Sequence, residues 1–564
     1  MLTAIAIKIE VVAVSRLWCR LLAVATIATV AMFSFAMLPR TARAADTGAI
    51  TVDGTVATRY DAYQLFSATV IDDDDAGHKI ATDVTWANGA VRQAVLPVLY
   101  DAGLDGSASA AQETAEWMNA DGHMTTALTA KLARAICNAD ATSVALNAGT
   151  AAELPCGYWL IVADDDAIAR GEAGTAPIMA LVGGSAVTVK PKAATPKVAK
   201  HVLEDSTAAW QKAADATVAD DLYWRLSATV PAGLTAYDTY TVRFVDTMSA
   251  GLDPSKVAAS MRVYVAAGAE GGFDAVACEG GNASSTPVKG WADITSQCKV
   301  SVEGCSFTVR TGDLIAALGG ADVFTAGARA VAVYNAPLNS ACNHGIAKGN
   351  PNEVYLRYPR SPLADQSGDA GFTRTPSDDA CAYTWDLALT KRGSDGDKPL
   401  AGAVLSIADD RGRTLAADGT WDAEGKATVT TGEDGRVTVS GVDSGKLEVR
   451  ELKAPMGYTA FEGTRSVTVK AEGLDVDQVA AAKPKLTITA ESPLRADSAD
   501  GSTGSLEASL INTPTGTPPS ITTGGFMPST GDMAMYAAAA AAVAGAVLIV
   551  VALLVKRGGG SHKE

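Results

Sequence analysis

Two long apolar runs, one near each end, decide which part of this 564-residue chain can fold in water. The C-terminal run, Met533–Val555, is followed at once by Lys556 and Arg557. A membrane-spanning helix needs about 20 apolar residues, because each adds only about 1.5 Å of rise. The run therefore predicts a transmembrane helix over 533–555, and the basic residues behind it predict a cytoplasmic end.

The N-terminal run, Leu21–Leu38, follows two arginines and precedes the small-residue sequence Ala42-Arg43-Ala44. This order is typical of a secretory signal peptide, so we expect residues 1–44 to be removed during export. The chain has a formal net charge of −17. Losing the two basic ends makes the rest more acidic, which argues against nucleic acid as a partner.

The sequence Met-Pro-Ser-Thr-Gly occupies 527–531, directly before the apolar run. Pentapeptide, span and basic end together resemble the cell-wall sorting signal of Gram-positive surface proteins, with Met527 in place of the usual leucine. The resemblance implies that a sortase cleaves between Thr530 and Gly531 and passes the Thr530 acyl group to an amine. Sortase and peptidoglycan would then be partners. An ordinary C-terminal membrane anchor is the alternative interpretation.

Seven of the eight cysteines follow the signal peptide, and an exported chain keeps disulfides. Cys137 and Cys156 are the expected pair in the first third. The connectivity of the remaining five stays open, because sequence alone does not set it: Cys278, Cys298, Cys305, Cys342 and Cys381. The histidines are scattered and CxxC is absent, so we predict neither a metal site nor a cofactor. The aspartate runs 72–75 and 164–166 are interpreted as solvated loop tips rather than calcium sites.

Short alternating strands with frequent turn residues predict a mainly β chain of tandem Ig-like β-sandwiches. Helical patterns at about 108–118 and 125–138 add helices to the first domain. Residues 361–379 are polar and rich in turn formers, which indicates a linker. The expected division is a signal peptide at 1–44, an N-terminal domain at 45–189, a central sandwich at 190–362, a third sandwich at 380–513, a Thr/Pro/Gly linker at 514–526 and the sorting signal at 527–564.

The third sandwich has the clearest motifs. It begins with Trp385–Lys391, continues through Glu-Leu-Lys-Ala-Pro-Met-Gly-Tyr at 451–458, and ends with Leu510–Pro514. These segments resemble a Cna protein B-type domain, in particular the last domain of Gram-positive shaft pilins. The resemblance implies an intramolecular isopeptide bond between Lys391 and Asn512, promoted by Glu451. The alternative is a solvated strand-end lysine and a surface glutamate. The segment between Tyr458 and Asn512 is long for this family, and we expect it to add a hairpin or loop.

The chemistry requires a dry pocket. A lysine is nucleophilic only when neutral, and burial lowers its pKa while raising that of a carboxyl group. A protonated Glu451 could hydrogen-bond the Asn512 carboxamide, stabilise the developing oxyanion and shuttle protons until ammonia leaves.

The central sandwich carries a weaker signature in three segments, at 196–202, 240–252 and 349–356. They resemble the central domain of the same pilins, which implies a bond between Lys200 and Asn352 assisted by Asp246. A turn-capping role for Asp246 is the alternative. Three other asparagines are rivals for the bond: Asn335, Asn339 and Asn350.

Val-Lys-Pro-Lys-Ala at 189–193 lies between the first two domains. It resembles the Val-Tyr-Pro-Lys-Asn segment of shaft pilins, which implies that Lys192 is the amine that sortase joins to the next subunit. Lys190 and Lys197 are alternatives. The first domain has no lysine in its opening strands, so we expect no such bond there.

Together these observations imply the backbone subunit of a sortase-assembled surface pilus, joined head-to-tail through Lys192 and Thr530 to copies of itself and to the cell wall. Minor pilins and a host ligand are further possible partners. A single wall-anchored adhesin or minor pilin that binds a host ligand is the alternative function. No motif of a hydrolase or nucleotide-binding enzyme is present, so we predict no enzyme acting on an outside substrate.

Overall fold

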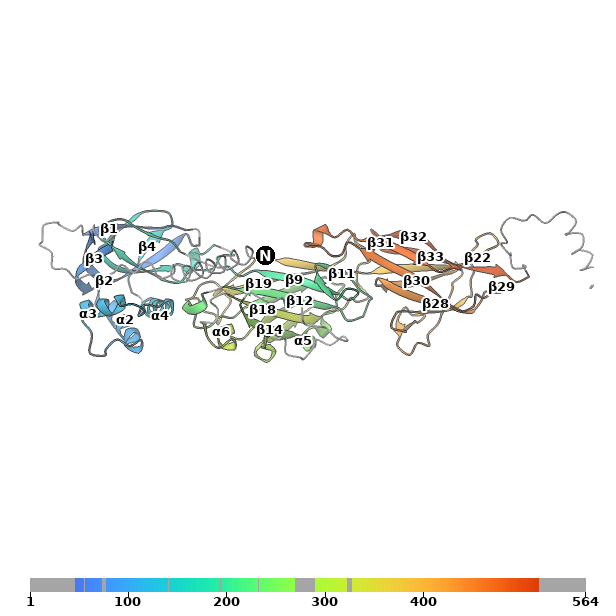
Figure 1. Cartoon of the computed structure of the whole chain (residues 1–564), viewed down its shortest axis with the longest axis horizontal. Coiled ribbons are helices and arrows are strands. Elements are labelled where there is room, and N and C mark those ends of the chain that lie inside the picture. Colours follow the sequence, from blue (N-terminus) through green and yellow to red (C-terminus); the bar gives the residue numbers. More distant parts are fainter. Residues whose placement is uncertain are drawn as a thin grey trace, which may run out of the picture.

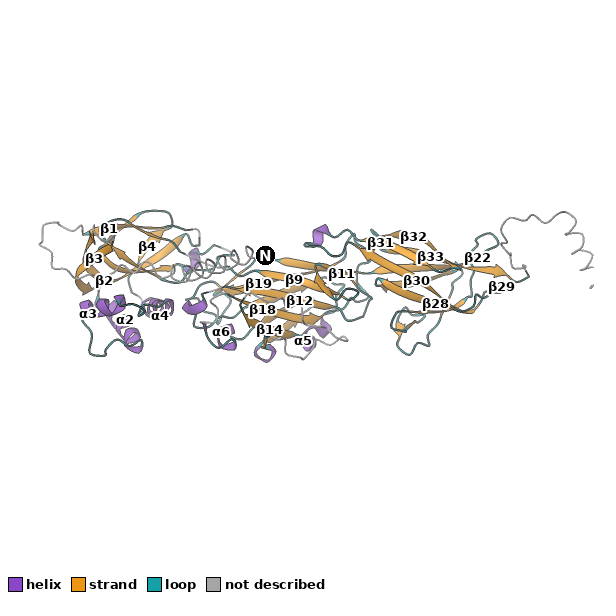
Figure 2. Cartoon of the chain, viewed as in Figure 1, coloured by secondary structure: helices purple, strands orange, loops and turns teal. Residues whose placement is uncertain are grey.

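The computed structural model describes residues 46–516 apart from 55, 74–77, 140, 170, 192–194, 232, 269–289 and 322–326. Three domains follow one another along a rod, from the blue N-terminal domain to the orange third domain (Figure 1). Strands dominate all three, and the longer helices cover only the first domain (Figure 2). The prediction of a mainly β chain with helices added to the first domain is confirmed.

The signal peptide and the sorting signal with its predicted transmembrane helix lie outside the described residues. Within 46–516, where the structure describes the chain, no helix is both long and apolar enough to cross a membrane.

The N-terminal domain has two sheets and three helices. Strand β6 is buried along its whole length, because the small sheet covers one face of its sheet and the helices cover the other. The larger sheet has the order β3-β2-β6-β7 with β4 beside β2, and the smaller sheet has the order β5-β1-β8. The strands are β1 (Thr47–Val52), β2 (Arg59–Asp73), β3 (His78–Trp86), β4 (Val144–Asn147), β5 (Ala152–Pro155), β6 (Gly157–Ala163), β7 (Ile178–Val182) and β8 (Val187–Val189).

Helices α3 (Ala111–Asn119) and α4 (Thr126–Asn138) lie where the sequence predicted them. Helix α2 (Gly89–Asp101) was not predicted, because Pro97 inside it argues against a helix. The helix forms because the Asn88 side chain caps its first turn, and because Val91, Val95 and Leu99 lie on one buried face.

The central domain is a sandwich of two sheets around one apolar core. One sheet has the order β10-β9-β12-β18-β14-β15; the other has the order β11-β21-β19-β13-β17-β16, with β20 beside β19. The strands are β9 (Val198–Glu204), β10 (Ala209–Gln211), β11 (Ala213–Asp215), β12 (Tyr223–Val230), β13 (Arg243–Met248), β14 (Arg262–Ala267), β15 (Ala292–Asp293), β16 (Lys299–Glu303), β17 (Ser306–Arg310), β18 (Ala328–Asn335), β19 (Asn350–Pro359), β20 (Phe372–Arg374) and β21 (Asp378–Tyr383), with short helices α5 (Val257–Ser260) and α6 (Leu314–Ala317).

The sheets place the boundary between the second and third domains later than the sequence suggested. Strands β20 and β21 both pair with β19, so the C-terminal part of the segment interpreted as a linker, from Phe372 onward, belongs to the central sheet. The third sandwich begins at Trp385 rather than at residue 380. The polar, Pro-containing sequence indicated a linker. Short strands form there nevertheless, because strands beside a sheet edge tolerate such residues.

The third domain is a second sandwich, with sheet orders β27-β22-β33-β29 (β32 beside β33) and β25-β24-β23-β28-β30-β31 (β26 beside β23). The segment between Tyr458 and Asn512 supplies β31 and β32, which extend both sheets. The strands are β22 (Trp385–Gly393), β23 (Val404–Ala408), β24 (Thr414–Leu415), β25 (Trp421–Asp422), β26 (Val429–Thr430), β27 (Arg436–Val442), β28 (Gly445–Lys453), β29 (Tyr458–Thr459), β30 (Thr464–Glu472), β31 (Lys485–Ala490), β32 (Leu494–Asp500) and β33 (Ser505–Pro514).

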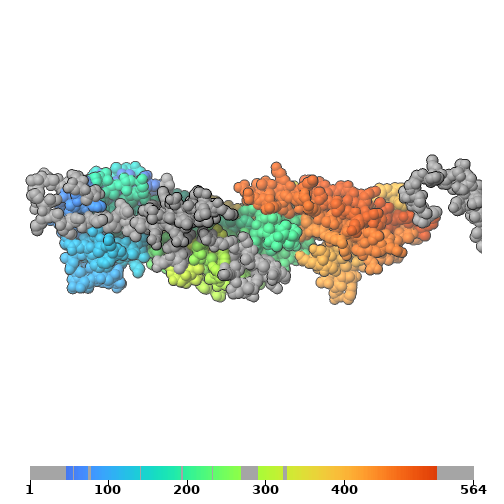
Figure 3. Space-filling view, viewed as in Figure 1, coloured from blue at the N-terminus to red at the C-terminus, as the bar shows by residue number. Residues whose placement is uncertain are grey.

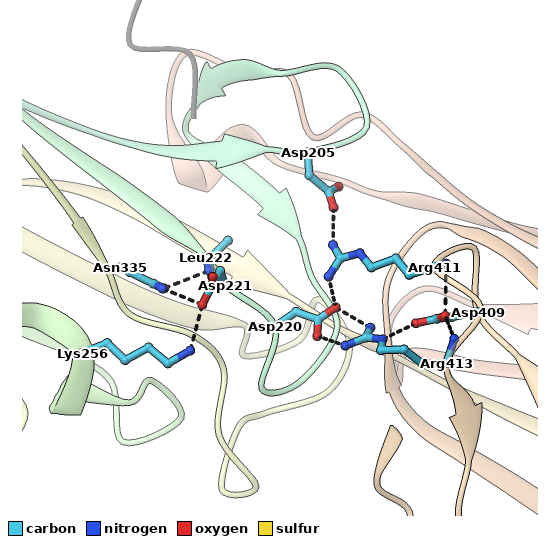
Figure 4. A network of polar contacts seen from close by, with 9 residues as sticks. All are labelled: Asp205, Asp220, Asp221, Leu222, Lys256, Asn335, Asp409, Arg411 and Arg413. Carbon is cyan, nitrogen blue, oxygen red and sulfur yellow. Dashed lines mark hydrogen bonds and ion pairs between the residues drawn. The ribbon is translucent and has the colours of Figure 1, made fainter. Parts of the chain in front are cut away.

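Polar contacts hold the central and third domains together. Asp220 of the central domain accepts hydrogen bonds from Arg411 and Arg413, and Asp409 holds Arg413 from the other side (Figure 4). Nearby, the Trp385 indole donates to Asp215 Oδ2 at 2.6 Å. Because Arg413 and Asp220 make two parallel bonds, the contact restricts orientation as well as distance.

The first junction is also built from named contacts. Arg134 of α4 donates to the carbonyls of Ala236 and Pro362 and pairs with Asp238. Leu363 of the central domain packs against the core of the first domain. In the space-filling view the green central domain adjoins the orange third domain (Figure 3).

Candidate functional site

Two lysine side chains are fully buried, one in each sandwich, and each lies beside a carboxyl group and an asparagine. A buried ammonium is costly unless it is paired, so such lysines are rare in structural cores. Both are the lysines that the sequence singled out.

In the third domain the lysine and the asparagine come from the first and last strands. Strands β22 and β33 run parallel, with Lys391 opposite Leu510 and Gly393 opposite Asn512. This register puts the two side chains on the same inner face, two positions apart. Glu451 reaches the pair from β28 in the facing sheet.

The three side chains of this site touch one another. Lys391 Nζ donates to Asn512 Oδ1 and lies 3.3 Å from Glu451 Oε1. Asn512 Nδ2 donates to the same Glu451 oxygen at 2.9 Å. The other Glu451 oxygen accepts the backbone N–H of Phe461 at 3.0 Å, which fixes the carboxyl group in place.

Burial lowers the pKa of Lys391 to about 8, although the nearby Glu451 carboxyl opposes the shift. About a tenth of the amine is therefore neutral at pH 7, far more than for an exposed lysine, and this fraction has its lone pair available beside the Asn512 carboxamide.

The central site is assembled across the two sheets. Lys200 lies on β9 of one sheet, and Asp246 and Asn352 lie on β13 and β19 of the other. Asn352 pairs with Met248, so it is a diagonal neighbour of Asp246 on the same face. All three side chains are fully buried.

The contacts here differ from those of the third domain. Lys200 Nζ forms an ion pair with Asp246 Oδ2. The Tyr334 hydroxyl, on β18, accepts from Lys200 Nζ at 2.9 Å and from Asn352 Nδ2 at 2.8 Å. Sequence reasoning missed Tyr334. Its only signal was its place in the alternating strand 328–335, where it reads as one more core residue.

Burial lowers the pKa of Lys200 to about 8, against the pull of Asp246. Burial also raises the pKa of Asp246, although the Lys200 charge opposes that shift. Both shifts reduce the free-energy difference between the ion pair and a neutral amine beside a neutral acid.

The rival asparagines of the central domain are held elsewhere. Asn335 bonds Asp221 and the backbone of Leu222, as Figure 4 shows. Asn339 donates to the Ala250 carbonyl, and Asn350 bonds the backbone around Asn343. Asn352 is the one that shares a hydroxyl with Lys200.

Other predicted site residues lie outside the described part of the chain. These are Lys192, Thr530 and Gly531. The alternative acceptors Lys190 and Lys197 flank the undescribed residues 192–194, and both are exposed.

The predicted disulfide between Cys137 and Cys156 is wrong in this structure. Cys137 carries a free thiol, which lies 3.8 Å from the Tyr63 hydroxyl. The Cys156 carbonyl accepts from Ala68, five residues further along β2. The two cysteines therefore contact β2 at positions about 16 Å apart along the strand, and no disulfide joins them. Cys298, Cys305, Cys342 and Cys381 carry free thiols as well, and Cys278 lies outside the described residues.

A family model, a curated relative and several solved structures match parts of this chain. Residues 386–483 match the SpaA family, described as a prealbumin-like fold domain. The match includes Lys391 and Glu451 and ends before Asn512. The third domain is therefore a SpaA prealbumin-like domain, in agreement with the Cna B-type resemblance.

A curated relative is the trypsin-resistant surface T6 protein of Streptococcus pyogenes serotype M6. It is 29% identical over 143 residues, which are 24% of this chain and 24% of that protein. The aligned region thus spans about a quarter of the relative's length.

Solved structures with a similar course include the T6 backbone pilin of the same species, with a TM-score of 0.47 and 16% identity over 84% of this chain and 100% of that one. The major pilin SpaD of Corynebacterium diphtheriae has a TM-score of 0.41 and 14% identity over 84% and 98%. The major pilin BcpA of Bacillus cereus has a TM-score of 0.38 and 12% identity over 83% and 99%.

Proposed function

We propose that this chain is the backbone subunit of a surface pilus, with its last two domains each closed by a self-formed Lys–Asn isopeptide bond. The observation that carries the proposal is the pair of buried Lys–acid–Asn sites, one in each sandwich. Similarity of the third domain to the SpaA family, and of the chain to the T6 protein, supports the same function.

In the third domain the proposed reaction needs only the three side chains. A neutral Lys391 amine attacks the Asn512 carboxamide carbon, and Glu451 in its acid form hydrogen-bonds the amide oxygen as negative charge develops there. The Cγ–Nδ2 bond breaks, ammonia leaves and an amide bond joins the strands. Glu451 already lies within hydrogen-bond reach of both nitrogens, which is the geometry that a proton shuttle requires.

The proposed bonds suit a molecule that is pulled from its ends. Chain enters the third domain at the start of β22 and leaves at the end of β33. A bond between Lys391 and Asn512 would carry tension directly from one strand to the other, while the 121 positions of chain that separate them stay unloaded. A wall-anchored polymer under shear needs this property.

Polymerisation completes the proposal. A sortase would cleave after Thr530 and join its carbonyl to Lys192 of the next subunit, and the last subunit would be joined to peptidoglycan. Lys190 and Lys197, on either side of the acceptor segment, are both exposed, which is consistent with access to this junction. The acceptor segment lies between the first and central domains, so successive subunits would overlap by one domain along the rod (Figure 1).

The experiment has two parts. Wall extracts of the native organism, resolved in SDS, should give a ladder of covalent multimers that collapses to monomer in Lys192→Ala but not in Lys299→Ala, a matched surface lysine. The intact mass of residues 45–526 should be lower by two ammonia molecules. A single band that Lys192→Ala leaves unchanged would favour a monomeric adhesin, and a full mass would exclude both isopeptide bonds.

A further inference from the structure

Tyr334 occupies the centre of the central site. Its hydroxyl lies 2.9 Å from Lys200 Nζ, 2.8 Å from Asn352 Nδ2 and 3.1 Å from Asp246 Oδ2. It accepts from the two nitrogens and donates to the carboxylate. These nitrogens are the attacking and the leaving atoms of the proposed bond.

The tyrosine is rigidly held. Its side chain is fully buried and packs edge-on against Phe307, with ring centroids 4.7 Å apart. The Lys200 ammonium lies 5.5 Å from the centroid of its ring. A hydroxyl fixed in this way has no water to compete for its three partners.

The acid alone does not connect the reacting groups here. Asp246 makes no hydrogen bond to Asn352 in the described contacts, and Asp246 Oδ1 and Asn352 Oδ1 are both buried without a partner. In the third domain, by contrast, one oxygen of Glu451 reaches both nitrogens. The central site therefore lacks the direct acid bridge that the third site has, and Tyr334 stands in its place.

We propose that Tyr334 is a catalytic residue that passes the proton from the attacking to the leaving nitrogen. This rests on the proposed Lys200–Asn352 bond. Asp246 first takes one proton from the Lys200 ammonium. The neutral Nζ attacks the Asn352 carboxamide carbon; one Nζ proton moves to the Tyr334 oxygen as the tyrosine's own proton moves to Nδ2.

The Cγ–Nδ2 bond then breaks and ammonia leaves, taking the proton held by Asp246 as ammonium. Nζ keeps one hydrogen as the new amide N–H, and Tyr334 ends with one proton, as it began. No oxidant or co-reactant is involved.

Tyr334→Phe tests the proposal, because it removes the hydroxyl and keeps the ring. The soluble region is made by cell-free translation with a labelled pulse, and the tryptic peptide joining Lys200 to Asn352 is quantified during the chase. The peptide joining Lys391 to Asn512, measured in the same sample, is the internal reference for the rate. Tyr358→Phe is the matched control, since Tyr358 is a buried tyrosine of the same core that donates to the Gly171 carbonyl away from the site.

We expect Tyr334→Phe to slow the central bond by at least ~10-fold relative to the third-domain bond, and Tyr358→Phe to leave both unchanged. A central bond that forms at the wild-type rate in Tyr334→Phe would overturn the proposal. Absence of that bond from the wild-type chain would overturn it together with the proposed chemistry, which separates the two failures.

A second variant distinguishes a catalytic role of Tyr334 from a folding defect. Replacing Tyr334 by 3,5-difluorotyrosine keeps the hydroxyl and the ring but makes the phenol more acidic. The pH profile of central-bond formation should move toward lower pH, while that of the third-domain bond stays in place. An unchanged central profile would contradict a proton-transfer role, because a purely structural hydroxyl would not respond to its acidity.

Discussion

At the scale of single residues, both candidate sites bury a lysine beside an acid and an asparagine, but the residues that connect them differ. Each removes a lysine from water until its pKa falls to about 8, and each puts an acid and an amide within reach. The acid is a glutamate from the facing sheet in the third domain. In the central domain it is a shorter aspartate beside the asparagine, and a tyrosine spans the remaining gap.

Glu451→Gln should therefore abolish the third-domain bond while leaving the central one intact. The amide fills the same space but cannot act as an acid, so the soluble region should lose one ammonia instead of two by intact-mass measurement. Without the cross-link the third domain should lose about 5 kcal/mol of stability, by analogy with a disulfide that closes a loop of this length. Glu448→Gln, an exposed change on the same strand, is the control. Loss of two ammonia molecules from Glu451→Gln would exclude the glutamate from the reaction.

At the scale of elements, the joint between the central and third domains depends on where a few strands end. Glu204 ends β9 and Asp215 ends β11, and the Asp215 backbone N–H donates to Glu204 Oε2. Asp443 follows β27 and lies beside the same group. Burial, and then the charge of Asp215, raise the pKa of Glu204 to about 7.

A carboxyl pKa that is higher in the folded state than in the unfolded chain makes the folded state less stable as pH rises. Between the ordinary glutamate pKa and about 7, the folded joint binds more protons than the unfolded chain, so stability falls as pH rises through this window. We expect the melting temperature of the central-plus-third fragment to be higher at pH 5.5 than at pH 8 by a few degrees, as measured by calorimetry.

Glu204→Gln should flatten this dependence, because glutamine stays neutral in both states. Glu303→Gln, on an exposed strand edge, should keep it. A melting temperature of the wild-type fragment that rises from pH 5.5 to pH 8 would contradict the assignment. Burial also raises the pKa of the nearby Asp205, so the comparison of the variants, rather than the wild-type curve alone, tests the role of Glu204.

At the scale of the whole molecule, the two proposed bonds protect the two sandwiches from tension to different extents. In the third domain the bond lies near both ends of the path. In the central domain tension would pass from β9 to Asn352 and then through β19, β20 and β21 to Trp385. That last part has no covalent bypass and is held by pairing of β21 with β19 and β11, and by the Lys212–Asp378 ion pair.

Single-molecule stretching of the soluble region should show this asymmetry. We expect no extension from the chain between Lys391 and Asn512, since the bond bypasses it. Lys391→Ala should add an unfolding event of about 430 Å, which is 121 positions at roughly 3.6 Å each. Arg436→Ala, which alters an exposed ion pair of the same domain, should not add the event. An event of that length in the wild-type chain would show that the bond is absent.

The sequence by itself determined the class and order of the domains, because the alternation of apolar and polar residues can be recognised within each segment alone. The lysines and acids of the two sites were predicted from segments that resemble pilin domains, and such segments can be recognised in the sequence alone. Lys391 and Glu451 are examples: their motifs are local, and the inward face of their strands follows from the two-residue period.

Only the tertiary structure decided what depends on register between distant strands. It placed Cys137 and Cys156 beside different parts of β2, assigned 372–383 to the central sheet and placed the Tyr334 hydroxyl between Lys200 and Asn352. A strand's own residues set which side chains face inward. Which of them meet is set by how far its neighbours are shifted, and no single segment contains that shift.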